Sequence, residues 1–312
     1  MTKKEQKDLT QYIKPLNMNG LRGRVLDMPP SKKKNKQILL LYGHHASIER
    51  MLGLAEELNK YGSVCLPDLP GFGGMQSLYK IGAEPDLDAL ADYLAAFIKM
   101  RYSHRRLTII GMSFGFIVAV RMMQRYPELT KKIDVIISIV GFAHHEDFYI
   151  PAHTKFLLNA GSSLFSKRAP AIFARYVFLN SLVIRATYLL VADRNVKMKD
   201  ASTTERSRRI NFEVGLWQSN DVRTYARTGK VMLTLDLCKN TKQLSVPVHH
   251  VQVEEDRYFD NRIVKEHLSI VFKDVSIMKT SLKGHAPTTV ATAKEAAPFI
   301  PRKLRSILKG TV

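Results

Sequence analysis

The chain has 312 residues, of which 45% are hydrophobic, and it carries a formal net charge of +20. This length and composition exclude a disordered chain and fit one large α/β domain, or a core domain with an inserted lid. The hydrophobic runs are too short to span a bilayer, no signal-like segment is visible, and two cysteines cannot form a disulfide framework, so we expect a cytoplasmic protein.

Strands and helices alternate through the first half of the chain. Residues 1–18 read as a mobile or helical lead-in, and the lysine-rich residues 32–36 read as a hairpin tip. The expected strands are apolar without a period of two, which is typical of strands buried on both faces of a parallel sheet. Strands are expected at residues 21–28, 37–42, 63–66, 107–110 and 133–140, and helices at residues 48–61, 87–100 and from 116 to just before Pro127.

This alternation stops after Phe142 and resumes near residue 246. The sequence between them is helical, irregular and locally charged, so we expect a lid inserted between two strands of one sheet. The predicted fold is therefore an α/β class with a mostly parallel central sheet flanked by helices and an inserted helical lid. Its parts are residues 1–147 (core), 148–240 (lid) and 241–312 (core), with strands at 246–253 and 275–280, a helix at 261–271 and a last helix to 308 broken at Pro298 and Pro301.

A Gly-x-Ser-x-Gly motif, with Ser113 at its centre, lies between a predicted strand and a predicted helix. A strand that turns sharply into a helix holds its central residue on a strained turn and exposes that side chain. Gly111 and Gly115 lack Cβ atoms, so the strand and the helix can pass close to the turn. We therefore predict that Ser113 is a nucleophile.

A nucleophilic serine needs a histidine base, and the histidine needs a carboxylate that fixes its tautomer. In an open α/β sheet these groups lie beyond the carboxyl ends of the strands. His285 follows the last predicted strand in a loop, and Asp256 comes three residues after the strand at 246–253. Glu255 and Asp260 are the alternatives for the carboxylate.

The chain order Ser113, Asp256, His285 is the order of the α/β-hydrolases. The chain resembles that superfamily, in the branch of single-domain esterases with a helical lid, over roughly residues 20–145 and 245–310. The resemblance rests on five segments: an oxyanion segment at 40–44 with Tyr42 in place of the usual histidine, an Asp-x-x-Gly-x-Gly loop at 64–73, the serine motif at 111–115, a strand-to-acid segment at 246–256 with Val253 in place of the usual glycine, and Gly284-His285.

The resemblance also implies the groups around the nucleophile. The backbone N–H groups of His44 and Phe114 would form the oxyanion hole that stabilises a tetrahedral intermediate. We expect Gly43, His45, Met112, His144 and His145 to line the pocket. No metal is expected, because His144-His145 has no third ligand at a recognisable spacing. No cofactor is expected, and His249-His250 inside a strand reads as a pair of core or packing histidines.

The implied function is a serine hydrolase that cleaves a carboxylic ester with an apolar part through an acyl-enzyme. A serine nucleophile argues against the epoxide hydrolases and haloalkane dehalogenases of the superfamily, which use an aspartate. Other α/β-hydrolase reactions stay open: amide, thioester or carbon–carbon bond hydrolysis, and acyl transfer. A further alternative is a non-catalytic, basic member that binds lipid or a partner protein.

Residues 169–192 are apolar apart from Arg175, Asn180 and Arg185. As a single helix, this segment and the preceding Arg168 would place three arginines on one face. It is either a lid helix packed over the pocket or a helix that associates weakly with an anionic membrane surface. The positive charge is either a solvated surface or an attraction to anionic lipid, and no nucleic-acid-binding motif is present.

Overall fold

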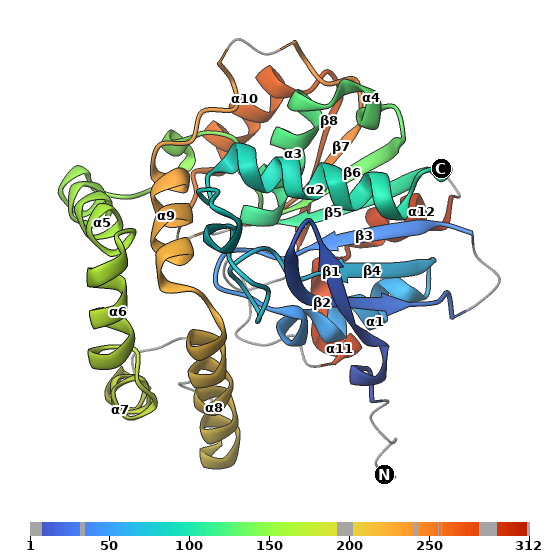
Figure 1. The fold of residues 1–312 in the computed structure, drawn as a ribbon. Helices are drawn as coiled ribbons and strands as arrows, with labels where there is room; N and C mark the ends of the chain where they lie inside the picture. The colour runs from blue at the N-terminus through green and yellow to red at the C-terminus, as the bar shows by residue number, and fades with distance from the viewer. Residues whose placement is uncertain are drawn as a thin grey trace.

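The computed structural model describes residues 8–31, 35–191, 202–239, 242–254, 256, 258–280 and 292–310. Its centre is one sheet with the strand order β1-β2-β4-β3-β5-β6-β7-β8 (Figure 1). The six strands from β4 to β8 in this order run parallel, and β1 and β2 are antiparallel to their neighbours. The strands are β1 Ile13–Met18, β2 Leu21–Met28, β3 Gln37–Leu41, β4 Ser63–Pro67, β5 Leu107–Met112, β6 Ile133–Ile139, β7 Val248–Val253 and β8 Val275–Thr280.

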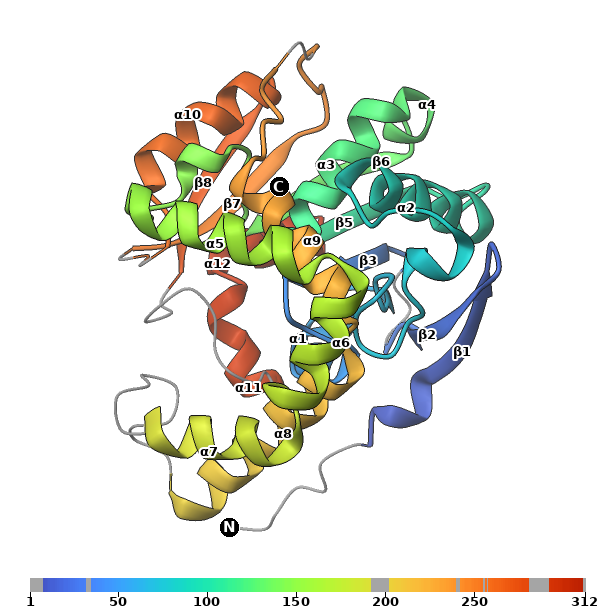
Figure 2. The same ribbon diagram turned by 60° about the vertical axis from the view of Figure 1, so that its left-hand side comes forward.

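Helices cover both faces of this sheet. Helix α2 packs beside α3 on one face, and α1 packs beside α11 on the other (Figures 1 and 2). Every residue of β5 is buried, as expected for a central parallel strand between two helical layers. The predicted fold class is confirmed. The core helices are α1 Leu52–Asn59, α2 Leu87–Arg101, α3 Phe114–Arg125, α4 Pro127–Thr130, α10 Asn261–Val271, α11 Ala293–Ala296 and α12 Arg302–Lys309, with short 3₁₀ turns at Thr10–Tyr12, Ile48–Met51, Leu78–Ile81, His145–Asp147 and Ala297–Phe299.

The N-terminal part of the sheet differs from the prediction. Residues 13–18 form strand β1 instead of a helical or mobile lead-in. Asn19 and Gly20 both have positive φ angles, 50° and 78°, as a tight hairpin turn requires, and Asn-Gly is the strongest short hairpin signal. The lysine-rich stretch at residues 32–36 does not join neighbouring strands, because β4 lies between β2 and β3.

Among the residues described between β6 and β7, in the segment predicted as a lid, the chain forms five helices. Helix α9 packs against α5 and α6, and α8 packs against α7 (Figure 2). In Figure 1 these helices extend away from the sheet. They are α5 Ala152–Phe165, α6 Arg168–Val177, α7 Ser181–Val191, α8 Thr203–Ser219 and α9 Val222–Leu233.

The segment at 169–192 is not one helix. Helices α6 and α7 meet at an angle of 67°, so the three arginines do not share one helical face. Asn180 causes the break: its amide donates to the carbonyls of Tyr176 and Val177 at the end of α6, and its Oδ1 accepts the N–H groups of Leu182 and Val183. Within the described ranges no single helix is long and apolar enough to span a membrane, although this bent pair meets the length and composition criteria.

Candidate active site

Ser113 lies between the end of β5 and the start of α3. Its backbone angles are φ 45° and ψ −112°, a conformation that non-glycine residues rarely adopt. The Ser113 N–H donates to the carbonyl of Ile139 at the end of β6, at 2.9 Å. The neighbouring strand therefore holds this turn in place, as a strained nucleophile position needs.

The two glycines of the motif are required by close contacts. A Cβ on Gly111 would lie 2.6 Å from Cα of Phe116, and a Cβ on Gly115 would lie 2.5 Å from the carbonyl oxygen of Tyr42. Both distances are below any normal carbon contact, so a side chain at either position would push α3 away from the sheet. As predicted, the absence of Cβ atoms at these two glycines lets the strand and the helix pass close to the turn.

The loop after β3 passes directly beside Ser113. A Cβ built on Gly43 would lie 3.4 Å from Cβ of Ser113 and 3.8 Å from the Met112 side chain. His44 follows in the same loop, and Phe114 is the buried first residue of α3. The two residues proposed to supply oxyanion N–H groups, one in the loop after β3 and one at the start of α3, thus lie on either side of the serine.

Helix α9, in the segment predicted as a lid, holds the His44 side chain. The Nε2–H of His44 donates to the carbonyl of Tyr225 at 3.2 Å and lies 2.9 Å from Thr228 Oγ1. The ring also packs against Phe72, Phe114 and Tyr225. Loss of hydration in this setting, with the neighbouring His45, lowers the pKa of His44 to about 3, so the ring is neutral at pH 7.

His45 faces lid helix α8. Its φ is 55°, its Nε2 lies 3.3 Å from Glu213 Oε2, and its ring packs at a tilt against Trp217 with a centroid distance of 4.2 Å. Arg50 also donates to the Glu213 carboxylate, at 2.6 Å. Burial opposes ionisation of Glu213, but its hydrogen bond from His45 and the Arg50 charge outweigh burial and lower its pKa. The loop beside the serine is therefore tied to two lid helices.

A buried aspartate that sequence reasoning did not assign a role supports this loop. Asp68 is fully buried, and its Oδ1 accepts the Tyr42 hydroxyl at 3.1 Å and the Ile48 N–H at 3.2 Å. Arg24 Nε donates to its Oδ2 at 3.0 Å. Burial raises the pKa of Asp68 to about 7, against the opposing charge of Arg24. The only sequence signal was the Asp-x-x-Gly-x-Gly loop itself, in which Asp68 is the first residue.

The structure places the proposed acid but not the proposed base. His285 and Glu255 lie outside the described residues. Asp256 follows β7, and its Oδ1 accepts the N–H groups of Tyr258 and Phe259 at 2.8 and 3.3 Å. Asp260, the other alternative, caps α10 by accepting the N–H groups of the first helical turn. The hydrogen-bonded triad therefore stays a prediction.

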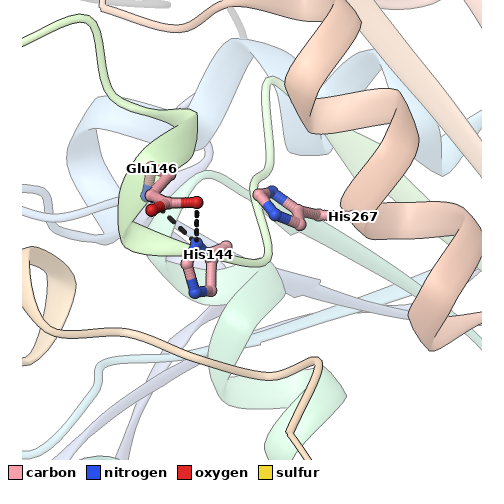
Figure 3. Close-up of side chains that lie close together, drawn as sticks. All are labelled: His144, Glu146 and His267. Carbon is pink, nitrogen blue, oxygen red and sulfur yellow. Dashed lines mark hydrogen bonds and ion pairs between the residues drawn. The ribbon is translucent and has the colours of Figure 1, made fainter.

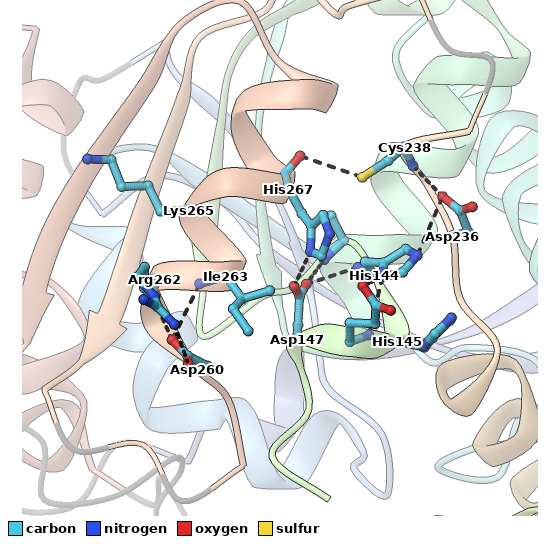
Figure 4. Close-up of polar contacts among 12 residues, drawn as sticks. His144, His145, Asp147, Asp236, Cys238, Asp260, Arg262, Ile263, Lys265 and His267 are labelled. Carbon is cyan, nitrogen blue, oxygen red and sulfur yellow. Dashed lines mark hydrogen bonds and ion pairs between the residues drawn. The ribbon is translucent and has the colours of Figure 1, made fainter. Parts of the chain in front are cut away.

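His144 and His145 follow β6 and lie beside the lid (Figure 4). The His144 ring lies 4.2 Å from the His145 ring and 4.5 Å from the His267 ring, measured between centroids. His145 Nδ1 lies 2.9 Å from Lys155 Nζ, in a hollow between α5 and the end of α9. These contacts place both histidines against α5, α10 and the end of α9.

The two strand histidines behave as the sequence indicates. His250 is buried, and its Nδ1 lies 2.9 Å from Ser138 Oγ on β6. His249 is half-buried, on the opposite face of β7. Burial lowers the pKa of His250 to about 4, although the charge of Asp256 opposes this shift. His250 is therefore a neutral core residue at pH 7.

Lowering the pH should reduce the free energy of unfolding, because His250 is buried in its neutral form. An unfolded histidine, with a pKa near 6.5, binds a proton between pH 6.5 and 4 that the folded His250 does not bind, so stability falls as the pH falls through this window. The expected loss is about 2 kcal/mol of unfolding free energy at pH 5. Urea unfolding at pH 7 and pH 5 measures it, and His250→Asn should lose less stability between these pH values than the wild type. An equal loss in both proteins would contradict the assignment.

Comparisons with known proteins agree with this fold. A family model described as "Serine aminopeptidase, S33" matches residues 32–277. A search of curated proteins found no match. Among solved structures, the chain is similar to an N-formylmaleamic acid deformylase from Pseudomonas putida S16 (19% identity, TM-score 0.62, covering 87% of this chain and 94% of that one). It is also similar to a carboxylesterase structure from Nitrososphaera gargenis (16%, 0.63, 96% and 97%) and to a putative lipase from Acinetobacter baumannii AYE (14%, 0.62, 100% and 99%).

Proposed function

The chain belongs to the serine aminopeptidase S33 family of α/β-hydrolases, and on this premise we propose that it is a serine hydrolase that cleaves a carboxylic ester with an apolar acyl or alcohol part. The observation that carries this proposal is the strained backbone of Ser113, held beside the loop of Gly43 and His44. A strained turn at the carboxyl end of a central strand is the conformation that exposes a nucleophilic serine, and this supports the proposal.

In the proposed reaction Ser113 Oγ attacks the ester carbonyl carbon. His285 takes the serine proton, and the backbone N–H groups of His44 and Phe114 stabilise the oxyanion. The bond to the alcohol oxygen breaks as His285 returns the proton to that oxygen. Water then attacks the acyl-enzyme with the same base, and Asp256 keeps His285 in the required tautomer.

A series of p-nitrophenyl esters of increasing acyl length tests this proposal. We expect hydrolysis of at least one ester, with kcat/KM rising with acyl length before it levels off, because buried apolar side chains, those of Met112 and Phe114, flank Ser113. The similar structures include a deformylase as well as a carboxylesterase, so matched anilides should be measured in parallel. Faster cleavage of the anilide would indicate that the substrate is an amide and not an ester. No cleavage of either compound would favour the non-catalytic alternative.

We also propose that the lid associates with an anionic membrane surface. Among the described residues, all exposed large hydrophobic side chains lie between Tyr149 and Leu190, except for Ile81, Met100, Tyr258 and Ile270. Apolar surface of this extent is uncommon on a monomer that stays in water. Residues 149–191 also contain five lysines and arginines but no aspartate or glutamate. An apolar surface with only positive charge is complementary to anionic lipid.

Vesicle co-sedimentation tests the association. The protein should pellet with phosphatidylglycerol-containing vesicles at low ionic strength, and less so at 1 M salt, where the Debye length falls to about 3 Å. Leu182 and Leu190 are 78% and 84% exposed on α7, so Leu182→Ser with Leu190→Ser should weaken binding at least about tenfold with little change in folding. Ile81→Ser, at an exposed site outside the lid, is the control. No pelleting at low salt would remove the proposal.

A further inference from the structure

Three side chains that can ligate a metal lie close together beside the lid (Figure 3). His144, Glu146 and His267 each offer one ligand atom, and these three atoms lie within 4.8 Å of one another. His144 and Glu146 are at the 3₁₀ turn that follows β6, whereas His267 is on α10, more than 100 residues later. The sequence expectation of no metal considered only the pair His144-His145, whereas the group in the structure joins His144 and Glu146 to a histidine on a distant helix.

The distances suit a small transition-metal ion. A tetrahedral zinc site, with metal–ligand bonds of about 2.0–2.2 Å, holds its ligand atoms roughly 3.3 Å apart. His144 Nδ1 and Glu146 Oε2 are already 3.5 Å apart. The Glu146 side chain is largely exposed and can rotate, and binding would replace the long hydrogen bond of 3.3 Å from the Glu146 N–H to His144 Nδ1.

A carboxylate lies on the other side of each of the two rings, and the carboxylate beside His267 is buried. Asp147 is fully buried, and its Oδ1 lies 2.5 Å from His267 Nδ1, which leaves Nε2 of that ring as the atom for a metal. Asp147 Oδ2 accepts the N–H groups of Ala143 and His144, so this carboxylate is fixed (Figure 4). Asp236 Oδ1 lies 4.0 Å from His144 Nε2. Metal-binding histidines characteristically donate their second N–H to such a carboxylate.

We propose that His144, Glu146 and His267 bind a divalent transition-metal ion of the zinc type, with water as the fourth ligand. The two imidazoles and one carboxylate favour zinc over calcium or magnesium, which prefer oxygen ligands. The site joins the turn that leads into α5 to the core helix α10, so a bound ion would fix the start of the lid to the core. This role is structural and separate from the proposed chemistry at Ser113.

The test uses the full-length, untagged protein, freed of metal with a chelator and desalted. Competition with a chromophoric zinc indicator should show one Zn²⁺ per chain, and Zn²⁺ should raise the melting temperature as expected for a ligand of the folded state. Glu146→Gln and His267→Ala should each weaken binding at least about tenfold, and Asp147→Asn about 10–100-fold although it removes no ligand. His104→Ala, at an exposed site, should bind like the wild type.

Asp147 also accepts backbone N–H groups, so a weaker affinity in Asp147→Asn can reflect a less stable fold. Glu146→Gln changes only an exposed side chain, so its affinity reports on metal ligation itself. Absence of stoichiometric Zn²⁺ binding at pH 7.5 would overturn the proposal. So would unchanged affinity in both Glu146→Gln and His267→Ala.

Discussion

Replacement of Ser113 by alanine is expected to lower kcat/KM for the best ester by at least about 10³-fold, because the proposed acyl-enzyme cannot form without the hydroxyl. The fold should be retained. The Ser113 side chain makes no capping hydrogen bond to α3, and alanine has the same Cβ, so the strained turn gains no new contact. Steady-state hydrolysis and the melting temperature of both proteins measure the two effects.

Ser219→Ala is the matched control, since Ser219 ends lid helix α8 at an exposed position. Its activity should stay within a few-fold of the wild type. Retention of most activity by Ser113→Ala would contradict the proposed nucleophile. A loss of activity together with a large drop in melting temperature would instead indicate that the turn, and not the hydroxyl, was disturbed.

Replacement of Asp256 by asparagine is expected to lower kcat by about 10⁴-fold, because an amide cannot hold the base in the tautomer that accepts the serine proton. The backbone hydrogen bonds from Tyr258 and Phe259 can be kept, since the amide oxygen is also an acceptor. The loop should therefore keep its shape. Measurements of kcat with a saturating ester, alongside circular dichroism, separate chemistry from folding.

Asp260→Asn is the control for this variant. Asp260 caps α10, and asparagine is about as good an N-cap as aspartate, so this substitution should change neither activity nor stability appreciably. If Asp260→Asn lost activity while Asp256→Asn kept it, the acid of the proposed triad would be Asp260. Loss in neither protein would point to Glu255 or to a site without a triad.

Two helices of the predicted lid contact the loop beside Ser113 directly. His44 and His45 are adjacent in the loop beside Ser113, and they bond to α9 and α8 respectively. If these helices moved, the contacts would break or the loop would move with them, so the position of α8 and α9 is coupled to the loop beside Ser113. The Glu213 carboxylate, bound by His45 and Arg50, is the centre of this coupling.

Local patterns predicted most of the fold. Apolar strands and periodic helices were placed within a few residues, and the serine turn was identified from five consecutive residues whose glycines meet close contacts. Two of the wrong predictions, at the first hairpin and at residues 169–192, concern segments in which a single polar residue or a dipeptide determines the structure. Asn19-Gly20 specified the first hairpin, and Asn180 caps two helices at once, so it divides a segment that apolar periodicity alone joins.

Features that depend on distant residues could not be predicted. Asp68 gains its role only when its loop lies against Tyr42 and Arg24. His267 approaches His144 because α10 packs beside the turn after β6, and no spacing along the chain encodes that neighbour. The base for Ser113 also depends on a distant residue. His285 is assigned to this role by chain order and family pattern, and it lies outside the described residues.

The central claim is that Ser113 is a reactive nucleophile, and labelling with a fluorophosphonate probe followed by peptide mass spectrometry tests it most directly. The expected result is one modification per chain, on the peptide that contains Ser113, absent in Ser113→Ala and in heat-denatured protein. No modification of the folded wild type, or equal modification of the Ser113→Ala variant, would contradict it.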